Sequence, residues 1–317
     1  MFSVRLPGNS TKPSAWSALC AYPGRFDIAR INAGGERLRV ELLESYERGK
    51  DELEALKRLR KRFDLHRARA TTLLSAADYQ LLQIESPNAT DPAERLELVR
   101  ARVQDMIDTP VAHVTLDTLE IPTQELAPGR PRNAYAVVAG NAVIAPKVGM
   151  FHAAGIALKA IDIPEMAQRN IAALCEQPNR GLALLAFGES DGLLTFTCNG
   201  ELYMSRRIEV GLSQLLTNDL DRRSTLYDRV GLEVQRSLDN FDRQYGFIPL
   251  SRLLLGPQPD ATPLQGFLRD YLSITVDVLD LAEILDCEAV PELRRPDRQA
   301  QCLLTLGAAL RSEETAP

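Results

Sequence analysis

Two runs of three extended segments, one in each half of the chain, constrain the fold more than any other feature. In the first half the candidate strands cover 16–21, 26–31 and 37–43, separated by Pro23-Gly24 and Gly34-Gly35. In the second half they cover 182–187, 193–198 and 201–210, and Asn199-Gly200 is a strong signal for a tight hairpin. Three strands joined by short turns predict an antiparallel meander. The chain is therefore predicted to have a mixed α/β fold with an internal pseudo-repeat.

Amphipathic helical patterns follow both meanders. Leu53, Leu56, Leu59 and Phe63 form a stripe that predicts a helix over 50–63. A longer stripe, with spacings of three and four, runs from Tyr227 to Tyr245. Further strands are predicted over 71–74, 79–84, 111–121, 135–139, 157–163, 250–255 and 274–279, and further helices over 91–107, 142–152, 165–174, 263–272 and 297–311.

The chain length indicates two lobes. A chain of 317 residues exceeds the usual size of one compact core, because domains commonly hold about 150 residues. We place the first lobe at 1–155, with an inserted subdomain at about 71–121, and the second lobe at 156–296. A closing helix and tail cover 297–317, and the polar stretch 128–132 marks a loop.

The composition argues against several classes of protein. The chain has 37 Lys and Arg against 43 Asp and Glu, a net charge of −6, which disfavours a nucleic-acid binder that neutralises phosphates. The longest apolar runs, such as 182–187, are far shorter than the roughly 20 residues of a membrane span, and residues 1–12 lack a signal-peptide pattern. Five cysteines without a C-x-x-C pair predict reduced thiols, so we expect a cytoplasmic protein.

One five-residue motif raises the possibility of a hydrolase. Gly188-Glu189-Ser190-Asp191-Gly192 matches G-x-S-x-G, the turn that exposes a nucleophilic serine in α/β hydrolases. That chemistry requires a helix after the serine and a histidine later in the chain. Here a predicted strand follows Ser190, and no histidine follows His152. We therefore interpret the segment as a hairpin turn in which glycines supply the special backbone dihedrals.

Other motifs for metal or phosphate binding are missing from the sequence. The three histidines, His66, His113 and His152, share no metal-ligand spacing. The chain has no G-x-x-x-x-G-K-[ST], and Gly34-Gly35 lacks the strand–glycine–helix setting of a dinucleotide site. A standard phosphate loop is therefore not predicted.

The segment 48–69 is strongly basic within an acidic chain. It holds nine Lys and Arg and four Asp and Glu. A solvated helical face is the simplest interpretation. The alternative is a docking surface for an acidic partner or for anionic lipid headgroups, near which each basic residue contributes about 1 kcal/mol.

The order of the elements and three passages resemble the MshI/PilM family of type IV pilus assembly proteins. The first passage combines YQLLQIESP at 79–87 with DMIDTP at 105–110 and LDTLEIP at 116–122. The second combines GEL at 200–202 with SRRIEVG at 205–211, and the third combines EVQRSLD at 233–239 with RLLLG at 252–256. This resemblance implies the actin-like ATPase fold, a duplicated ribonuclease-H-like fold with two lobes and an inserted subdomain.

The resemblance also implies a nucleotide site, from which this chain departs in three loops. The family's first phosphate loop carries aspartate and glycine, whereas the corresponding turn here is AYPGRF at 21–26. The expected D-x-G of the second meander is Ala186-Phe187-Gly188, and the adenosine-side glycine pair is Gly256-Pro257, where proline removes a backbone amide. The candidate vestigial nucleotide residues are Gly24, Gly188, Ser190 and Gly256.

We expect this site to be degenerate, with no catalytic residue and no metal ligand. Asp27 and Asp191 lie nearby in the sequence and could replace the missing carboxylates, so binding of ATP with Mg²⁺ stays open. A working ATPase of the same fold is the alternative interpretation, and magnesium-dependent ATP turnover distinguishes the two.

The resemblance finally implies a partner. Members of this family serve as cytoplasmic scaffolds of the pilus machinery and bind the short cytoplasmic tail of an inner-membrane assembly protein. We therefore expect recruitment to the inner membrane through that partner, with the tail held beside the insertion at 71–121 and with no nucleic acid involved.

Overall fold

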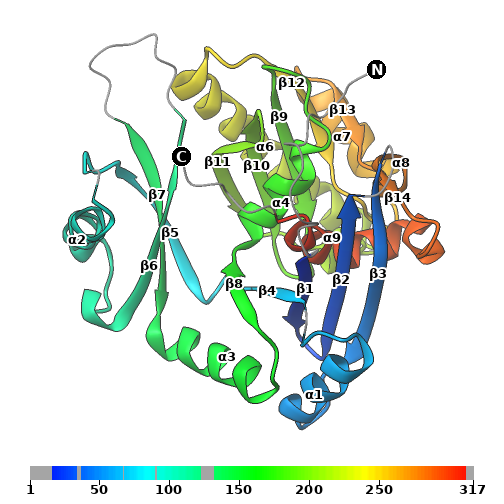
Figure 1. Ribbon diagram of the computed structural model, residues 1–317. Helices are drawn as coiled ribbons and strands as arrows, with labels where there is room; N and C mark the ends of the chain where they lie inside the picture. The colour runs from blue at the N-terminus through cyan, green and yellow to red at the C-terminus, as the bar shows by residue number, and fades with distance from the viewer. Residues whose placement is uncertain (1–15, 34–36, 67, 90, 123–131, 312–317) are drawn as a thin grey trace.

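The computed structural model describes residues 16–33, 37–66, 68–89, 91–122 and 132–311 (Figure 1). The predicted turn at Gly34-Gly35 and most of the polar loop at 128–132 lie outside the described residues. The described strands form two large mixed sheets and one small sheet.

The first large sheet is built on the N-terminal meander. β1 (Trp16–Tyr22), β2 (Arg25–Ala33) and β3 (Leu38–Glu47) are antiparallel, and β4 (Arg69–Leu73) and β8 (Leu158–Asp162) extend the sheet in parallel with β1. The short β14 (Leu285–Asp286) pairs with β3 at the other edge. The strand order is β14-β3-β2-β1-β4-β8.

The second large sheet repeats this plan. β9 (Gly181–Phe187), β10 (Gly192–Cys198) and β11 (Glu201–Ile208) form the meander, and β12 (Leu250–Leu255) and β13 (Val276–Val278) follow in parallel with β9. The order β11-β10-β9-β12-β13 matches that of the first sheet without β14, which confirms the predicted pseudo-repeat. Asn199 and Gly200 have φ of +52° and +79°, the left-handed values that a two-residue hairpin turn requires.

Two helices, α4 (Pro164–Ala173) and α9 (Pro296–Ala309), pack between the large sheets. Their shared core takes small or aliphatic side chains from β1, from β9 and from both helices. The helices cross where Gly307 meets the backbone of Ala167, and Asn170 donates to the Gly307 carbonyl at 2.9 Å. This crossing needs glycine, because a Cβ at 307 would overlap the Ala167 carbonyl.

The remaining helices flank the sheets. α1 (Glu52–Arg62) follows the first meander, α6 (Leu220–Tyr245) and α7 (Thr262–Tyr271) pack in the core of the second lobe, and α5 (Leu212–Leu215) and α8 (Leu281–Ile284) are short. α6 buries one apolar stripe that includes Val230, Val234, Leu238 and Phe241. No described helix is long and apolar enough to span a bilayer.

The insertion is a separate three-stranded antiparallel sheet with the order β5-β7-β6. Its strands are β5 (Tyr79–Glu85), β6 (Val114–Glu120) and β7 (Asn133–Gly140), and α2 (Pro92–Val103) packs against one face. α3 (Asn141–Ala153) then leads back to β8. Figure 1 shows this subdomain beside the second lobe, and Tyr135 of β7 donates a hydrogen bond to the Tyr203 carbonyl of β11 at 3.0 Å.

Three boundaries differ from those expected from the sequence. The insertion was expected at 71–121, but β4 belongs to the first large sheet, because it pairs with β1, and the insertion's central strand, β7, lies beyond residue 121. The segment 157–163 was assigned to the second lobe, but β8 pairs with β4 in the first sheet. The expected strand at 111–121 begins only at Val114, since 111–113 form a 3₁₀ turn after Pro110.

Candidate functional site

The first candidate residue, Gly24, lies in the tight turn between β1 and β2. Its φ of +74° is a conformation that glycine adopts without strain. The carbonyl of Gly24 accepts a hydrogen bond from the Arg48 amide at 2.9 Å, and the Arg48 side chain donates to the Tyr22 carbonyl at 3.2 Å. The end of β3 therefore holds this turn in place.

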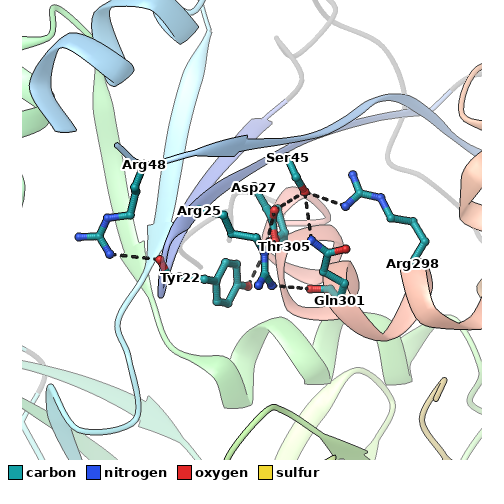
Figure 2. Close-up of polar contacts among 8 residues, drawn as sticks. All are labelled: Tyr22, Arg25, Asp27, Ser45, Arg48, Arg298, Gln301 and Thr305. Atoms are coloured by element: carbon teal, nitrogen blue, oxygen red, sulfur yellow. Dashed lines mark hydrogen bonds and ion pairs between the residues drawn. The ribbon is translucent and has the colours of Figure 1, made fainter. Parts of the chain in front are cut away.

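Asp27, one of the two carboxylates considered as replacements, is fully buried and already paired (Figure 2). Arg25 Nε donates to Asp27 Oδ2 at 3.0 Å and to Oδ1 at 3.2 Å. The Ser45 hydroxyl also donates to Asp27, and Ser45 in turn accepts from Arg298 of α9 at 2.7 Å. This network ties β2 and β3 to α9, so Asp27 has a structural role here.

The neighbouring end of β1 is closed in the same way. The Tyr22 hydroxyl lies 3.1 Å from Thr305 Oγ1 of α9 (Figure 2), and burial raises the pKa of this tyrosine well above its ordinary value. Burial also raises the pKa of the Cys20 thiol from 9.0 to about 12 and that of the Cys302 thiol to about 12. The Cys20 and Cys302 thiols are therefore enclosed between β1 and α9 and are protonated at neutral pH.

A second buried carboxylate, Asp162, lies at the carboxyl end of β8. Its Oδ1 accepts from the Ile163 amide at 3.0 Å, and its Oδ2 accepts from Arg311 at 2.9 Å. The Asp162 side chain is 7% exposed, and Arg311, which follows α9, also lies over the Trp16 ring. Sequence reasoning missed this pair, because its members are far apart along the chain.

The turn between β9 and β10 holds Gly188 and Ser190. The Gly188 amide donates to the Asp191 carbonyl at 2.8 Å, and β10 begins at Gly192. The strand after Ser190 confirms the hairpin interpretation, since a hydrolase elbow requires a helix there. Gly211, at the start of α5, packs so closely on this turn that a Cβ there would overlap the Glu189 carbonyl.

Asp191, the other replacement candidate, is held by an arginine at the same turn. Arg207 donates to Asp191 Oδ2 at 2.9 Å and to Glu165 Oε1 at 2.8 Å, and it contacts the Tyr79 hydroxyl at 2.5 Å. Burial lowers the pKa of Arg207, but the nearby Glu165, Tyr79 and Asp191 together outweigh that effect, and the net pKa is raised. Burial and the Glu165 charge also raise the pKa of Tyr79 far above its usual range.

The fourth candidate, Gly256, follows β12 beside the same region. Its amide donates to the Leu185 carbonyl at 2.6 Å, and a Cβ there would lie 2.8 Å from the Cβ of Ala186. The structure thus brings Gly256 close to β9 and its turn. Pro257 offers no amide hydrogen, and Gln258 is buried with an unpartnered Nε2 atom.

These residues do not fit a magnesium-bound triphosphate. Asp162 lies at the carboxyl end of β8, and Asp27 and Asp191 lie beside the carboxyl ends of β1 and β9. Sheets of the α/β class bind ligands at such ends, but each of these carboxylates is paired with an arginine. A magnesium ion needs free carboxylate or phosphate oxygens. In the part of the chain that the structure describes, no three His, Cys, Asp or Glu residues are grouped to hold a metal ion.

Two grooves border the insertion instead. The larger, with a volume of about 700 Å³, lies between β5, β11 and α6 and is polar. Its lining includes four arginines, Arg206, Arg207, Arg236 and Arg243. Glu233 accepts from both Arg206 and Arg236, at 3.1 and 3.3 Å.

The smaller groove, with a volume of about 450 Å³, lies between α3 and the start of β6. Ile144, Ala145, Val148 and Gly149 make most of its wall apolar, and Thr115, Asn141 and His152 complete the lining. α3 is rich in apolar residues, yet only Phe151 of its side chains is buried, and Val148 is 44% exposed. The groove therefore offers a small apolar wall that a partner's apolar side chain can contact.

Comparison with known proteins gave matches by structure alone. No family model matches the sequence, and no curated protein matches it. The chain is similar to PilM of the PilM–PilN type IV pilus biogenesis complex, with a TM-score of 0.70, 20% identity, and coverage of 95% of this chain and 98% of that one.

It is also similar to the cytoplasmic domain of EpsL, an inner-membrane component of the type II secretion system of Vibrio cholerae. That match has a TM-score of 0.50 and 16% identity, and it covers 95% of this chain and 97% of that one. The duplicated strand order and the match to PilM confirm the expected actin-like ATPase fold.

Proposed function

We propose that this chain is a non-enzymatic cytoplasmic scaffold of an MSHA-type or other type IV pilus, recruited to the inner membrane by a membrane-anchored assembly protein whose cytoplasmic tail it binds. The similarity to PilM in its complex with PilN supports a partner of this class. The observation that carries the proposal is the exposed apolar groove between α3 and β6, at the edge of the inserted subdomain.

The groove offers both kinds of contact that an extended peptide uses. β6 is an edge strand, because among the described strands it pairs only with β7. A tail segment laid along β6 would form backbone hydrogen bonds with it and place apolar side chains against Ile144 and Val148. The backbone bonds would supply affinity and the apolar wall would select the sequence.

We further propose that nucleotide has no role in this binding. The paired states of Asp27, Asp162 and Asp191 support this, together with Pro257 in the adenosine-side loop. Phosphoryl transfer depends on a metal ion and on charged groups that position the phosphates. The alternative, a working ATPase, requires these arginine pairs to open, and it predicts magnesium-dependent ATP turnover by the purified protein.

The docking proposal is tested with a synthetic peptide. The probe is the fluorescently labelled cytoplasmic tail of a PilN-like inner-membrane pilus assembly protein from the same organism, and the readout is fluorescence anisotropy. We expect Val148→Asp to weaken binding at least tenfold, because it places a charge where an apolar anchor is buried. Val278→Asp is the matched control, since Val278 is 38% exposed and lies on β13 of the second large sheet, which does not line the groove.

Two results would count against the docking proposal. Equal affinity of the Val148→Asp and Val278→Asp proteins would show that the apolar groove is not the docking site. Loss of binding in Arg243→Glu with full binding in Val148→Asp would place the tail in the polar groove instead.

A further inference from the structure

The basic segment expected from the sequence folds as α1, and its charge is concentrated in one part of the helix. Five of its eleven residues are Lys or Arg, and two are Glu. Both glutamates lie in the first turn, where Glu52 pairs with Arg48 and Glu54 pairs with Lys57. Asp51 caps the helix by accepting the Glu54 amide at 3.0 Å. The acidic groups therefore balance only the N-terminal half.

The C-terminal half presents a basic face that no neighbour neutralises. Arg58, Lys61 and Arg62 are exposed and share one side of the helix, because residues three and four apart are neighbours there. Among the described residues no carboxylate pairs with Arg58 or Lys61, and the next acidic residue, Asp64, lies 2.8 Å from Nδ1 of His66. Arg62 lies over the rings of Tyr46 and Phe63, which fix the direction of this face.

The helix that carries the basic face, α1, lies beside α3, which lines the apolar groove. Figure 1 shows α1 and α3 next to each other at the lower end of the molecule, and Arg60 Nε donates to the carbonyl of Gly155, just after α3, at 2.9 Å. α3 contains one lysine and no acidic residue. Neither helix therefore opposes the approach of an anionic surface to this end.

We propose that the end formed by α1 and α3 rests on the anionic headgroups of the membrane. Arg58, Lys61 and Arg62 bind lipid phosphates, which holds the end of the molecule that carries α3 near the bilayer from which a partner's tail emerges. The contact deepens the proposed function, because it orients the scaffold toward that tail. Lipid binding itself needs no partner, so the two proposals can fail separately.

The test is co-sedimentation of the protein alone with vesicles. We expect binding to vesicles that contain phosphatidylglycerol and little binding to pure phosphatidylcholine. Each basic residue near an anionic surface strengthens binding about fivefold, so Arg58→Glu with Lys61→Glu should weaken it by at least about 25-fold. The matched control is Arg180→Glu with Arg294→Glu, which changes the net charge by the same amount at two exposed arginines outside α1. Apart from the effect of net charge, which both variants share, we expect this control to bind anionic vesicles like the parent.

Thermal unfolding verifies that each variant is folded. If the glutamate variant fails to fold, Arg58→Gln with Lys61→Gln replaces it, and we expect this variant to lose about 25-fold in affinity for anionic vesicles. The inference is overturned if the parent ignores anionic vesicles, or if the α1 variant and its control bind them equally. It is also overturned if the α1 variant loses tail-peptide affinity but keeps vesicle binding, because α1 would then bind an acidic protein segment. We also expect the α1 variant to bind the tail peptide in solution with the same affinity as the parent.

Discussion

Replacing Arg25 with methionine tests whether Asp27 is a structural group. Asp27 is fully buried and receives two hydrogen bonds from Arg25 and one from Ser45. Methionine keeps much of the volume of arginine but removes its charge and its donors. The Asp27 carboxylate then stays buried without a counter-charge, a change that typically costs 3–5 kcal/mol. Because the Arg25 side chain is 30% exposed and water can partly replace it, we expect a loss of about 3 kcal/mol.

The partner substitution gives a different and smaller effect. Asp27→Asn removes the buried charge while the amide oxygen still accepts from Ser45, and Arg25 can turn toward solvent. We expect this variant to lose about 1 to 2 kcal/mol. In the double variant no charge is left buried without a partner, so its loss should be about 2 kcal/mol smaller than the sum of the two single losses.

Urea unfolding measures these differences directly. The chain has a single tryptophan, Trp16 at the start of β1, so its fluorescence reports on the sheet that contains Asp27. A loss below about 1 kcal/mol for Arg25→Met, or simple additivity of the two substitutions, would refute the view that this pair neutralises a buried carboxylate.

Three further predictions follow from the packing and the pKa values. Gly307→Ala should lower the free energy of unfolding by about 1 to 3 kcal/mol, because the new methyl group forces α4 and α9 apart. Gly266→Ala in α7, where a Cβ meets open space, should be neutral or slightly stabilising in the same urea titration. A fluorophosphonate probe should not label Ser190 in the folded protein, and stoichiometric labelling that disappears in Ser190→Ala would contradict the hairpin interpretation. Cys20 and Cys302, whose pKa values are raised to about 12, should resist thiol reagents until the protein unfolds. The folded state keeps these thiol protons, whereas the unfolded state loses them from about pH 9, so the free energy of unfolding should decrease between about pH 9 and 12. A free energy of unfolding that stays constant over this range would show that the thiols ionise freely in the folded protein.

Much of the fold could be predicted because its signals are local. Short extended segments joined by Pro-Gly, Gly-Gly and Asn-Gly turns marked the strands of both meanders, and the amphipathic stripe of α6 was visible from Tyr227 to Tyr245. The membership of β8 could not be predicted in the same way. A short parallel strand pairs with a distant segment, here β4, and its own residues do not specify which sheet it joins.

The candidate site was predictable only in part, for the same reason. The glycines stood out because turns need them, and the structure places Gly24, Gly188 and Gly256 in turns or close contacts. Arg25 could have been recognised as the partner of Asp27, because residues two apart in a strand share a face. Arg207 and Arg311 could not have been recognised as the partners of Asp191 and Asp162, since each reaches its carboxylate from an element remote in the sequence.

The most direct test of the scaffold proposal is the affinity of the purified chain for the partner's tail peptide, measured with and without Mg-ATP. A tail-binding protein without a nucleotide role should bind the peptide in the absence of ATP, and millimolar Mg-ATP should leave the dissociation constant unchanged. Binding that appears only with Mg-ATP, or an affinity that shifts tenfold on its addition, would show that the nucleotide site is functional and would contradict the proposal.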